Sequence, residues 1–265
     1  MKCVYLDGKY VGPERLKSSA ALRTGTGVFE TIRIKGNSPE YLKPHLARLR
    51  KGAKFIGLTP PDADYESLAG ELIKRNSLSG KLARLRIILQ RRHFCLILEP
   101  YNPPALNDYA TGVTLSSARH PFYENELARI KSTCRLPYSR LREKAAGERN
   151  FDCLLTDANG EILETTIGNL FVRDGKRFTT PPADSNRLQG IMEKMVIRNL
   201  KRKGFSVSEK NTGLEELSSE KEIFMTNSLI GVLPVRAIED TVLKNVTGEP
   251  VIGELVRKFS PHIQS

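Results

Sequence analysis

A lysine and a glutamate are the residues of this sequence that could carry covalent and proton-transfer chemistry. Lys131 lies in Leu127-Ala-Arg-Ile-Lys-Ser-Thr133, just after the expected boundary between two domains. A lysine that loses part of its hydration is less readily charged, and the neutral amine is a nucleophile suited to Schiff-base formation. Glu164 ends the far arm of a predicted hairpin, beside the small residues Thr165 and Thr166. Position alone leaves open the alternative that both are ordinary surface side chains.

Two further segments offer groups that bind anions. Leu188-Gln-Gly-Ile191 opens a predicted helix, where backbone N–H groups and the helix dipole attract phosphate. Thr226-Asn-Ser-Leu229 follows an apolar strand and supplies hydroxyl and amide donors. A helix cap explains the first segment as well as a phosphate site does, and a turn explains the second, so both alternatives stay open.

The sequence lacks the commonest motifs of several other enzyme classes. It contains no G-x-x-x-x-G-K-[ST], no G-x-S-x-G and no H-E-x-x-H, which argues against a phosphate-binding-loop enzyme, an esterase and a zinc peptidase. The four histidines and four cysteines show no metal-ligand spacing. We therefore expect no metal centre.

The elements that must position these residues do not follow the strict βαβ repeat of a doubly wound sheet. The sequence predicts a hairpin over residues 2–11 and strands over 28–35, 82–89, 93–98, 111–116, 151–156, 161–164, 169–172, 205–210 and 222–226. It predicts helices over 44–57, 65–75, 137–147, 190–203 and 252–259. This order favours an α+β fold of two lobes. We expect a small N-terminal domain at residues 1–117, a linker at 118–124 and a larger C-terminal domain at 125–265.

Length and composition indicate a globular protein with excess positive charge. The 265 residues exceed the usual length of one domain, and no apolar stretch approaches the roughly 18 to 20 residues that span a bilayer. The net charge of +12 leaves a non-catalytic nucleic-acid-binding protein as an alternative. Because the basic residues are dispersed and aromatic residues make up only 7%, a solvated surface explains the charge better. We expect a cytoplasmic protein, and anionic small molecules bound inside a cleft are a third explanation of the charge.

The order of these segments resembles the class IV pyridoxal-phosphate (PLP) enzymes, a family that includes branched-chain and D-amino-acid aminotransferases and aminodeoxychorismate lyase. The resemblance rests on six stretches, which are Gly25–Arg33, His45–Leu49, Ile130–Arg135, Asp157–Phe171, Leu188–Ile191 and Glu222–Val235. Each stretch alone is weakly diagnostic, but together they follow the order of the family over most of the chain. The resemblance implies the two-lobed fold of this family, PLP as cofactor and a homodimer.

The resemblance also implies a role for each site residue. Lys131 matches the lysine that forms a Schiff base with PLP and later moves a proton. Glu164 matches the carboxylate that keeps the pyridine nitrogen protonated, and Arg48 matches the arginine that binds the cofactor phosphate. The other matched cofactor-binding residues are Gly190, Ile191, Met192, Asn227 and Ser228 around the phosphate, and Leu188 against the ring.

The sequence departs from the family pattern at three places. Cys134 replaces a usual asparagine, and Met192-Glu193 replaces the Thr-Arg pair that is frequent in transaminases. The segment Gln90–Cys95 is short where transaminases have a longer substrate loop.

Two stretches, 28–33 and 226–235, look more like the lyase branch of the family. We therefore expect conversion of 4-amino-4-deoxychorismate to 4-aminobenzoate and pyruvate. The alternative is an aminotransferase that acts on D-amino or branched-chain amino acids with a keto-acid acceptor. Candidate residues for binding an anionic substrate are Thr31, Arg84, Arg86 and Arg135, each of which could instead be an exposed strand residue.

Overall fold

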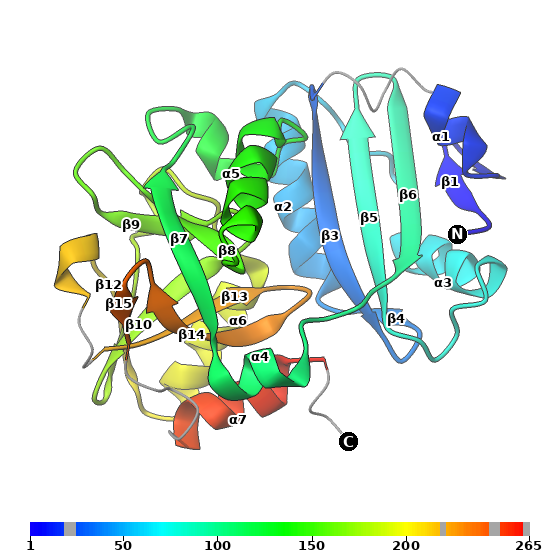
Figure 1. Cartoon of the computed structure of the whole chain (residues 1–265). Coiled ribbons are helices and arrows are strands. Elements are labelled where there is room, and N and C mark those ends of the chain that lie inside the picture. The colour runs from blue at the N-terminus through cyan, green and yellow to red at the C-terminus, as the bar shows by residue number, and fades with distance from the viewer. Residues whose placement is uncertain (19–24, 218–220, 244–249, 262–265) are drawn as a thin grey trace. The chain divides into compact units, whose positions relative to one another are not determined.

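The chain forms two compact units, each with its own β-sheet (Figure 1). The computed structural model describes residues 1–18, 25–217, 221–243 and 250–261. Unit 1 comprises Met1–Asn102 and Ile130–Arg135, and unit 2 comprises Pro103–Arg129 and Leu136–Ser265. Within the described residues, no helix combines the length and the apolar character needed to cross a bilayer. The mixture of sheets and helices confirms the predicted α+β class.

Unit 1 is built on a six-stranded antiparallel sheet with the order β2-β1-β6-β5-β3-β4. Its strands are β1 (Val4–Leu6), β2 (Lys9–Val11), β3 (Gly27–Lys35), β4 (Ser38–Pro39), β5 (Ala83–Gln90) and β6 (His93–Pro100). Its helices are α1 (Glu14–Ser18), α2 (Leu42–Phe55) and α3 (Tyr65–Arg75). The long strands β3, β5 and β6 are rich in branched residues, which favour the extended backbone.

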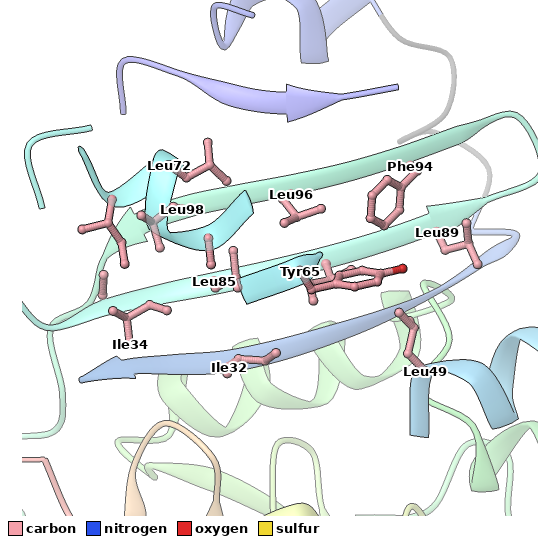
Figure 2. Packing of buried hydrophobic residues seen from close by; sticks show 14 of the residues in the cluster. Ile32, Ile34, Leu49, Tyr65, Leu72, Leu85, Leu89, Phe94, Leu96 and Leu98 are labelled. Atoms are coloured by element: carbon pink, nitrogen blue, oxygen red, sulfur yellow. The ribbon is translucent and has the colours of Figure 1, made fainter. Parts of the chain in front are cut away.

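One face of this sheet carries the apolar core of unit 1. Ile32 of β3 lies opposite Leu85 of β5, and because side chains alternate along a strand, every second residue joins them on that face. Figure 2 shows Tyr65 and Leu72 of α3 beside Leu96 of β6 in this core. The residues between the core positions point to the opposite face of the sheet.

Unit 2 is built on a nine-stranded mixed sheet with the order β12-β11-β10-β13-β14-β7-β8-β9, and β15 pairs with β14. Its strands are β7 (Val113–Arg119), β8 (Asp152–Thr156), β9 (Ile162–Thr165), β10 (Asn169–Asp174), β11 (Arg177–Thr180), β12 (Ser206–Glu209), β13 (Glu222–Asn227), β14 (Gly231–Ile238) and β15 (Thr241–Val242). The pairs β11–β12, β14–β7 and β7–β8 are parallel, and the others are antiparallel.

Helices cover parts of this second sheet. They are α4 (Leu106–Thr111), α5 (Leu136–Gly147), α6 (Ile191–Arg202) and α7 (Pro250–Phe259), together with the 3-10 turns η2 (Glu126–Arg129) and η3 (Leu214–Glu216). Helices α4 and α7 pack against β14, α5 packs against β7 and β8, and α6 packs against β12 and β13. The last turn of α6 contains Lys201 and Arg202, and Gly204 follows with a φ of 82°. The helix therefore ends at the predicted glycine cap.

The division into units differs from the boundaries expected from the sequence. Strand β7 continues to Arg119 and pairs with β8, so the start of the expected linker at 118–124 is part of the sheet of unit 2. The segment around Lys131 instead lies along the edge of β3. There, the N–H of Phe29 donates to the carbonyl of Lys131 (2.9 Å), and the N–H of Thr133 donates to the carbonyl of Gly27 (2.8 Å). These contacts group Lys131 with unit 1, whereas the sequence places it within 125–265.

The substitution Leu72→Ala tests the core of unit 1. Leu72 is fully buried, so its truncation should lower the free energy of unfolding by about 2–5 kcal/mol through lost burial and a residual cavity. Lys74→Ala, at an exposed position of the same helix, should change it by no more than about 0.5 kcal/mol. Urea denaturation measures both. Equal effects of the two substitutions would contradict this packing.

Candidate active site

Lys131 is held at the edge of β3 in unit 1. Its carbonyl accepts the Phe29 N–H, and the neighbouring Ser132 forms a bridge with Val28, so the backbone of this segment extends the sheet. The Nζ atom of Lys131 lies 4.7 Å from the centroid of the Phe29 ring. An ammonium group is attracted to the face of an aromatic ring. The sheet therefore fixes the position of Lys131, and Phe29 provides a surface for its amine.

Arg48 forms a bidentate pair with Glu30 along one edge of its guanidinium group. Its Nε donates to Glu30 Oε1 and its Nη2 to Glu30 Oε2, both at 2.8 Å. Glu30 is completely buried on the core face of β3, with 0% exposure. Burial alone would raise the pKa of Glu30, but the charge of Arg48 and hydrogen bonds from Arg48 and His45 lower it to about 2. Arg48, the expected phosphate ligand, is thus fixed by a permanently charged carboxylate.

His45 completes this cluster. Its Nδ1 lies 2.7 Å from Glu30 Oε2, and burial lowers the pKa of its ring. Because the carboxylate can only accept, Nδ1 carries the hydrogen of the neutral ring. Its buried Nε2 is then an acceptor, and it has no hydrogen-bond partner within the described part of the chain.

Sequence reasoning gave Glu30 no role, although a signal for it exists. Glu30 lies on the same face of β3 as Val28, Ile32 and Ile34, which all belong to the core. A carboxylate on the apolar face of a strand requires a buried partner, and the partner here is Arg48 of α2.

Three candidate substrate residues share the other face of the sheet in unit 1. Thr31 of β3 lies opposite Arg86 of β5. The residues next to each of them in its strand point to the core face, so Thr31 and Arg86 point to the other face. Arg84 follows the same alternation, and Phe29, which contacts Lys131, precedes Thr31 by two positions and shares its face. The structure thus brings Thr31, Arg84 and Arg86 to the face that carries the Phe29 ring.

The two arginines share one carboxylate on β6. Glu99 Oε2 lies 2.8 Å from Arg84 Nη2 and 3.7 Å from Arg86 Nη2. Burial, and next the charge of Arg84, lower the pKa of Arg86. Two guanidinium groups with a single glutamate leave one excess positive charge at this place. Arg135, the fourth candidate, is fixed through its backbone N–H, which donates to the Thr133 carbonyl at 2.8 Å.

Glu164 is held in unit 2 by a donor on each of its two oxygens. His120 Nε2 lies 3.1 Å from Oε1, and the backbone N–H of Leu188 donates to Oε2 at 3.3 Å. The side chain lies on β9 and Glu164 is only 6% exposed. A buried carboxylate that receives a hydrogen bond on each oxygen keeps a fixed direction.

Gly190 begins α6 in a place where no larger residue fits. A Cβ at Gly190 would lie 2.0 Å from Asn169 Oδ1, while Asn169 Nδ2 donates to the Leu188 carbonyl at 2.7 Å. This close packing holds the loop that contains Leu188 at the start of α6. The first-turn N–H groups of Ile191 and Met192 have no acceptor inside the helix, which is the arrangement that the proposed anion cradle requires.

A buried ion pair, which the sequence did not predict, supports this helix end. Arg187 is 2% exposed, and its Nη2 lies 2.8 Å from Glu193 Oε1. Glu193 also accepts from the Gly190 N–H (2.9 Å) and from the Thr180 hydroxyl (3.0 Å). Glu193 stands where transaminases frequently have arginine, so its role here is to hold the start of α6. Arg187 lies in the loop before Gly190 and Glu193 lies in the helix after it. No periodic pattern relates a loop residue to a helix residue, so the pair could not be predicted from the sequence.

Asn227 is used inside the turn between β13 and β14. Its Oδ1 accepts the N–H groups of Leu229 and Ile230 at 2.9 and 2.8 Å, and its Nδ2 donates to the Ile167 carbonyl at 3.1 Å. The Asn227 side chain therefore shapes the turn that presents Ser228. The buried hydroxyl of Thr226, one residue earlier, has no partner within the described part of the chain.

These residues fit PLP on two structural features. A Cβ at position 190 would meet Asn169 Oδ1, so glycine leaves room for that side chain beside the start of α6, and the helix start offers backbone donors to a phosphate group. Glu164 is a buried, fixed acceptor of the kind that keeps a pyridine nitrogen protonated.

The substitution Glu30→Gln tests the cluster around Arg48. Removing one partner of a buried pair should lower the free energy of unfolding at pH 7 by about 3 kcal/mol or more. The pKa of Glu30 is lowered from its ordinary value of 4.5 to about 2, so the stabilisation exists above pH 4.5 and is lost toward pH 2. The gap between the wild type and Glu30→Gln should therefore shrink over that interval.

A matched control is Glu71→Gln, which breaks the exposed Glu71–Arg75 pair of α3. It should change the free energy of unfolding by less than about 1 kcal/mol. Chemical denaturation at several pH values measures both variants. A Glu30→Gln variant as stable as Glu71→Gln at pH 7 would contradict the role of the buried pair.

Comparisons with known proteins identify the family to which the chain belongs. Residues 27–238 match the family model of amino-transferase class IV. An aminodeoxychorismate lyase of Vibrio harveyi is 31% identical over 91% of this chain and 92% of its own length. The branched-chain-amino-acid aminotransferase of Escherichia coli K12 is 27% identical over 97% and 91%. A hypothetical aminotransferase of Mycobacterium tuberculosis in its PLP-bound form has a similar fold, with a TM-score of 0.84 and 19% identity over 96% and 97%. The chain belongs to the class IV aminotransferase family of PLP-dependent enzymes.

Proposed function

We propose that this enzyme is a PLP-dependent lyase that converts 4-amino-4-deoxychorismate to 4-aminobenzoate and pyruvate. One observation carries the proposal: strands β5 and β6 pair up to Gln90 and His93, so only Arg91 and Arg92 connect them. This is the segment in which transaminases are expected to have a longer substrate loop. The 31% identity to the Vibrio harveyi lyase also supports it.

The face that carries Arg84 and Arg86 suits a substrate with two carboxylates. The two guanidinium groups share one carboxylate, Glu99, so an anionic substrate would compensate the remaining positive charge. Thr31 pairs with Arg86 and adds a hydroxyl to this face. We propose these three residues, with Arg135, as the substrate-binding residues.

Each remaining residue then has one task. Bound PLP supplies an electron sink for a carbanion. Lys131 Nζ anchors the cofactor, and once released it removes the ring proton beside the amine nitrogen of the substrate, so that pyruvate leaves as the ring becomes aromatic. Glu164 accepts a hydrogen bond from the protonated pyridine nitrogen, and Leu188 packs on the pyridine ring.

The phosphate group is assigned to the other cofactor-binding residues. We propose that it is held by Arg48 and by Gly190, Ile191, Met192, Asn227 and Ser228. We further propose a homodimer, as the resemblance implies, and a cytoplasmic location.

Transamination is the second candidate, supported by the identity to the Escherichia coli aminotransferase. In that reaction Lys131 moves a proton from the α-carbon of an amino acid, and a keto acid accepts the amine. Because the family consists of enzymes, the third idea, a non-catalytic nucleic-acid-binding protein, is set aside.

A product assay separates the two reactions. The PLP-loaded protein should release equal amounts of pyruvate and 4-aminobenzoate from 4-amino-4-deoxychorismate, without a keto acid. Coupled measurement of pyruvate and fluorescence of 4-aminobenzoate detect the two products. Spectral half-reactions with D-amino or branched-chain amino acids, together with no pyruvate release, would show that the transaminase reading is correct.

The substitution Arg86→Met tests the anion-binding face. It removes one charge-assisted hydrogen bond but keeps an apolar stem, so KM should rise about tenfold or more, with a smaller change in kcat. Arg91→Met in the exposed turn between β5 and β6 is the control and should leave KM unchanged. If KM of Arg86→Met equals that of the control, Arg86 does not bind the substrate.

A further inference from the structure

His120 contacts the side chain of Glu164 in unit 2 and is almost completely buried, with 1% exposure. It follows the last residue of β7, and its backbone N–H donates to the Thr156 carbonyl at the end of β8 (2.8 Å). Glu164 is on β9, on the other side of β8. The ring of Tyr138 from α5 packs edge-on against the imidazole, with centroids 5.5 Å apart and planes at 84°. Three strands and a helix thus fix the position of this ring.

The contacts of His120 define which nitrogen carries the hydrogen. The backbone N–H of Phe122 donates to His120 Nδ1 at 3.1 Å. A backbone N–H can only donate, so Nδ1 must present a lone pair. The single hydrogen of the ring is therefore on Nε2, where two oxygens face it, Glu164 Oε1 at 3.1 Å and the Tyr138 hydroxyl at 3.2 Å.

The same contact excludes a hydrogen from Nδ1 of His120. A hydrogen there would point at the Phe122 N–H, donor against donor. Glu164 consequently receives two N–H donors, one from the His120 imidazole and one from the Leu188 backbone. Because each donor reaches a different oxygen, together they fix the direction of the carboxylate.

We propose that His120 is a positioning residue, whose Nε2–H, set by the Phe122 N–H, directs the Glu164 carboxylate at the pyridine nitrogen of PLP. The proposal rests on the proposed function, because it assigns Glu164 to that nitrogen. It goes further in naming the residue that acts through Glu164 and the backbone group that sets its tautomer. Sequence spacing gave no sign of this, since His120 and Glu164 are 44 positions apart.

The first experiment tests the tautomer in the cofactor-free protein. Nitrogen-15 labelling of the four histidines, with His120→Gln to identify the His120 signal, reports which ring nitrogen carries the hydrogen. At neutral pH the His120 ring should show one protonated nitrogen, Nε2. A ring protonated on Nδ1, or on both nitrogens, would overturn the proposal whether or not PLP binds.

The second experiment tests the effect on PLP. His120→Phe removes the donor to Glu164 but keeps a ring, whereas His120→Gln keeps an N–H donor. With nitrogen-15 in the pyridine ring of PLP, the protonated fraction of that nitrogen should fall in His120→Phe, and the Kd of PLP should rise about tenfold or more. His120→Gln should remain close to the wild type.

Tyr138→Phe is the matched control, since it keeps the packed ring and removes only the hydroxyl next to His120. It should leave pyridine protonation unchanged. A folded His120→Phe variant with wild-type pyridine protonation and PLP affinity would show that His120 has no positioning role, while the proposed function stands. Failure of the wild type itself to bind PLP would instead overturn the proposed function and this inference with it.

Discussion

The burial of charge is the constraint on which the candidate site depends. A carboxylate or guanidinium removed from water must gain hydrogen bonds or an opposite charge, and three such groups lie at the site. Within the described residues, Glu30 is compensated by Arg48 and His45 and Glu193 by Arg187, while Glu164 accepts hydrogen bonds from His120 and Leu188. The first two arrangements fix Arg48, which we propose as a phosphate ligand, and the start of α6. The third orients the carboxylate that we propose as the partner of the pyridine nitrogen.

Much of the fold could be predicted from the sequence, because periodicity and turn residues are local signals. The alternation along residues 28–35 and the helical spacing after Pro44 correspond to β3 and α2, although α2 begins two residues earlier, at Leu42. The eight-residue strand β14 was missed, and so were the short elements α1, α4, β4, β11 and β15. A strand of two to four residues or a helix of six has too few positions to show a period, and its pairing partner is distant in sequence.

The supporting residues of the site could not be predicted in the same way. The roles of Lys131, Glu164 and the loop before α6 came from motif order, and those residues stay proposals. Their supports, among them His120 and Arg187, act through contacts that depend on strand order and loop path. Spacing along the chain carries no information about such contacts. In the sequence, His120 is only one of the four histidines without metal-ligand spacing, so its buried contact with Glu164 was not expected.

The central claim is that Lys131 is the residue that binds PLP covalently. Reduction of the PLP-loaded protein with borohydride, followed by digestion and mass spectrometry of the peptides, measures this directly. The account predicts that the reduced cofactor is attached to the peptide containing Lys131 and to no other lysine of the chain. Stable attachment at a different lysine, or PLP that binds without any reducible link to Lys131, would contradict it.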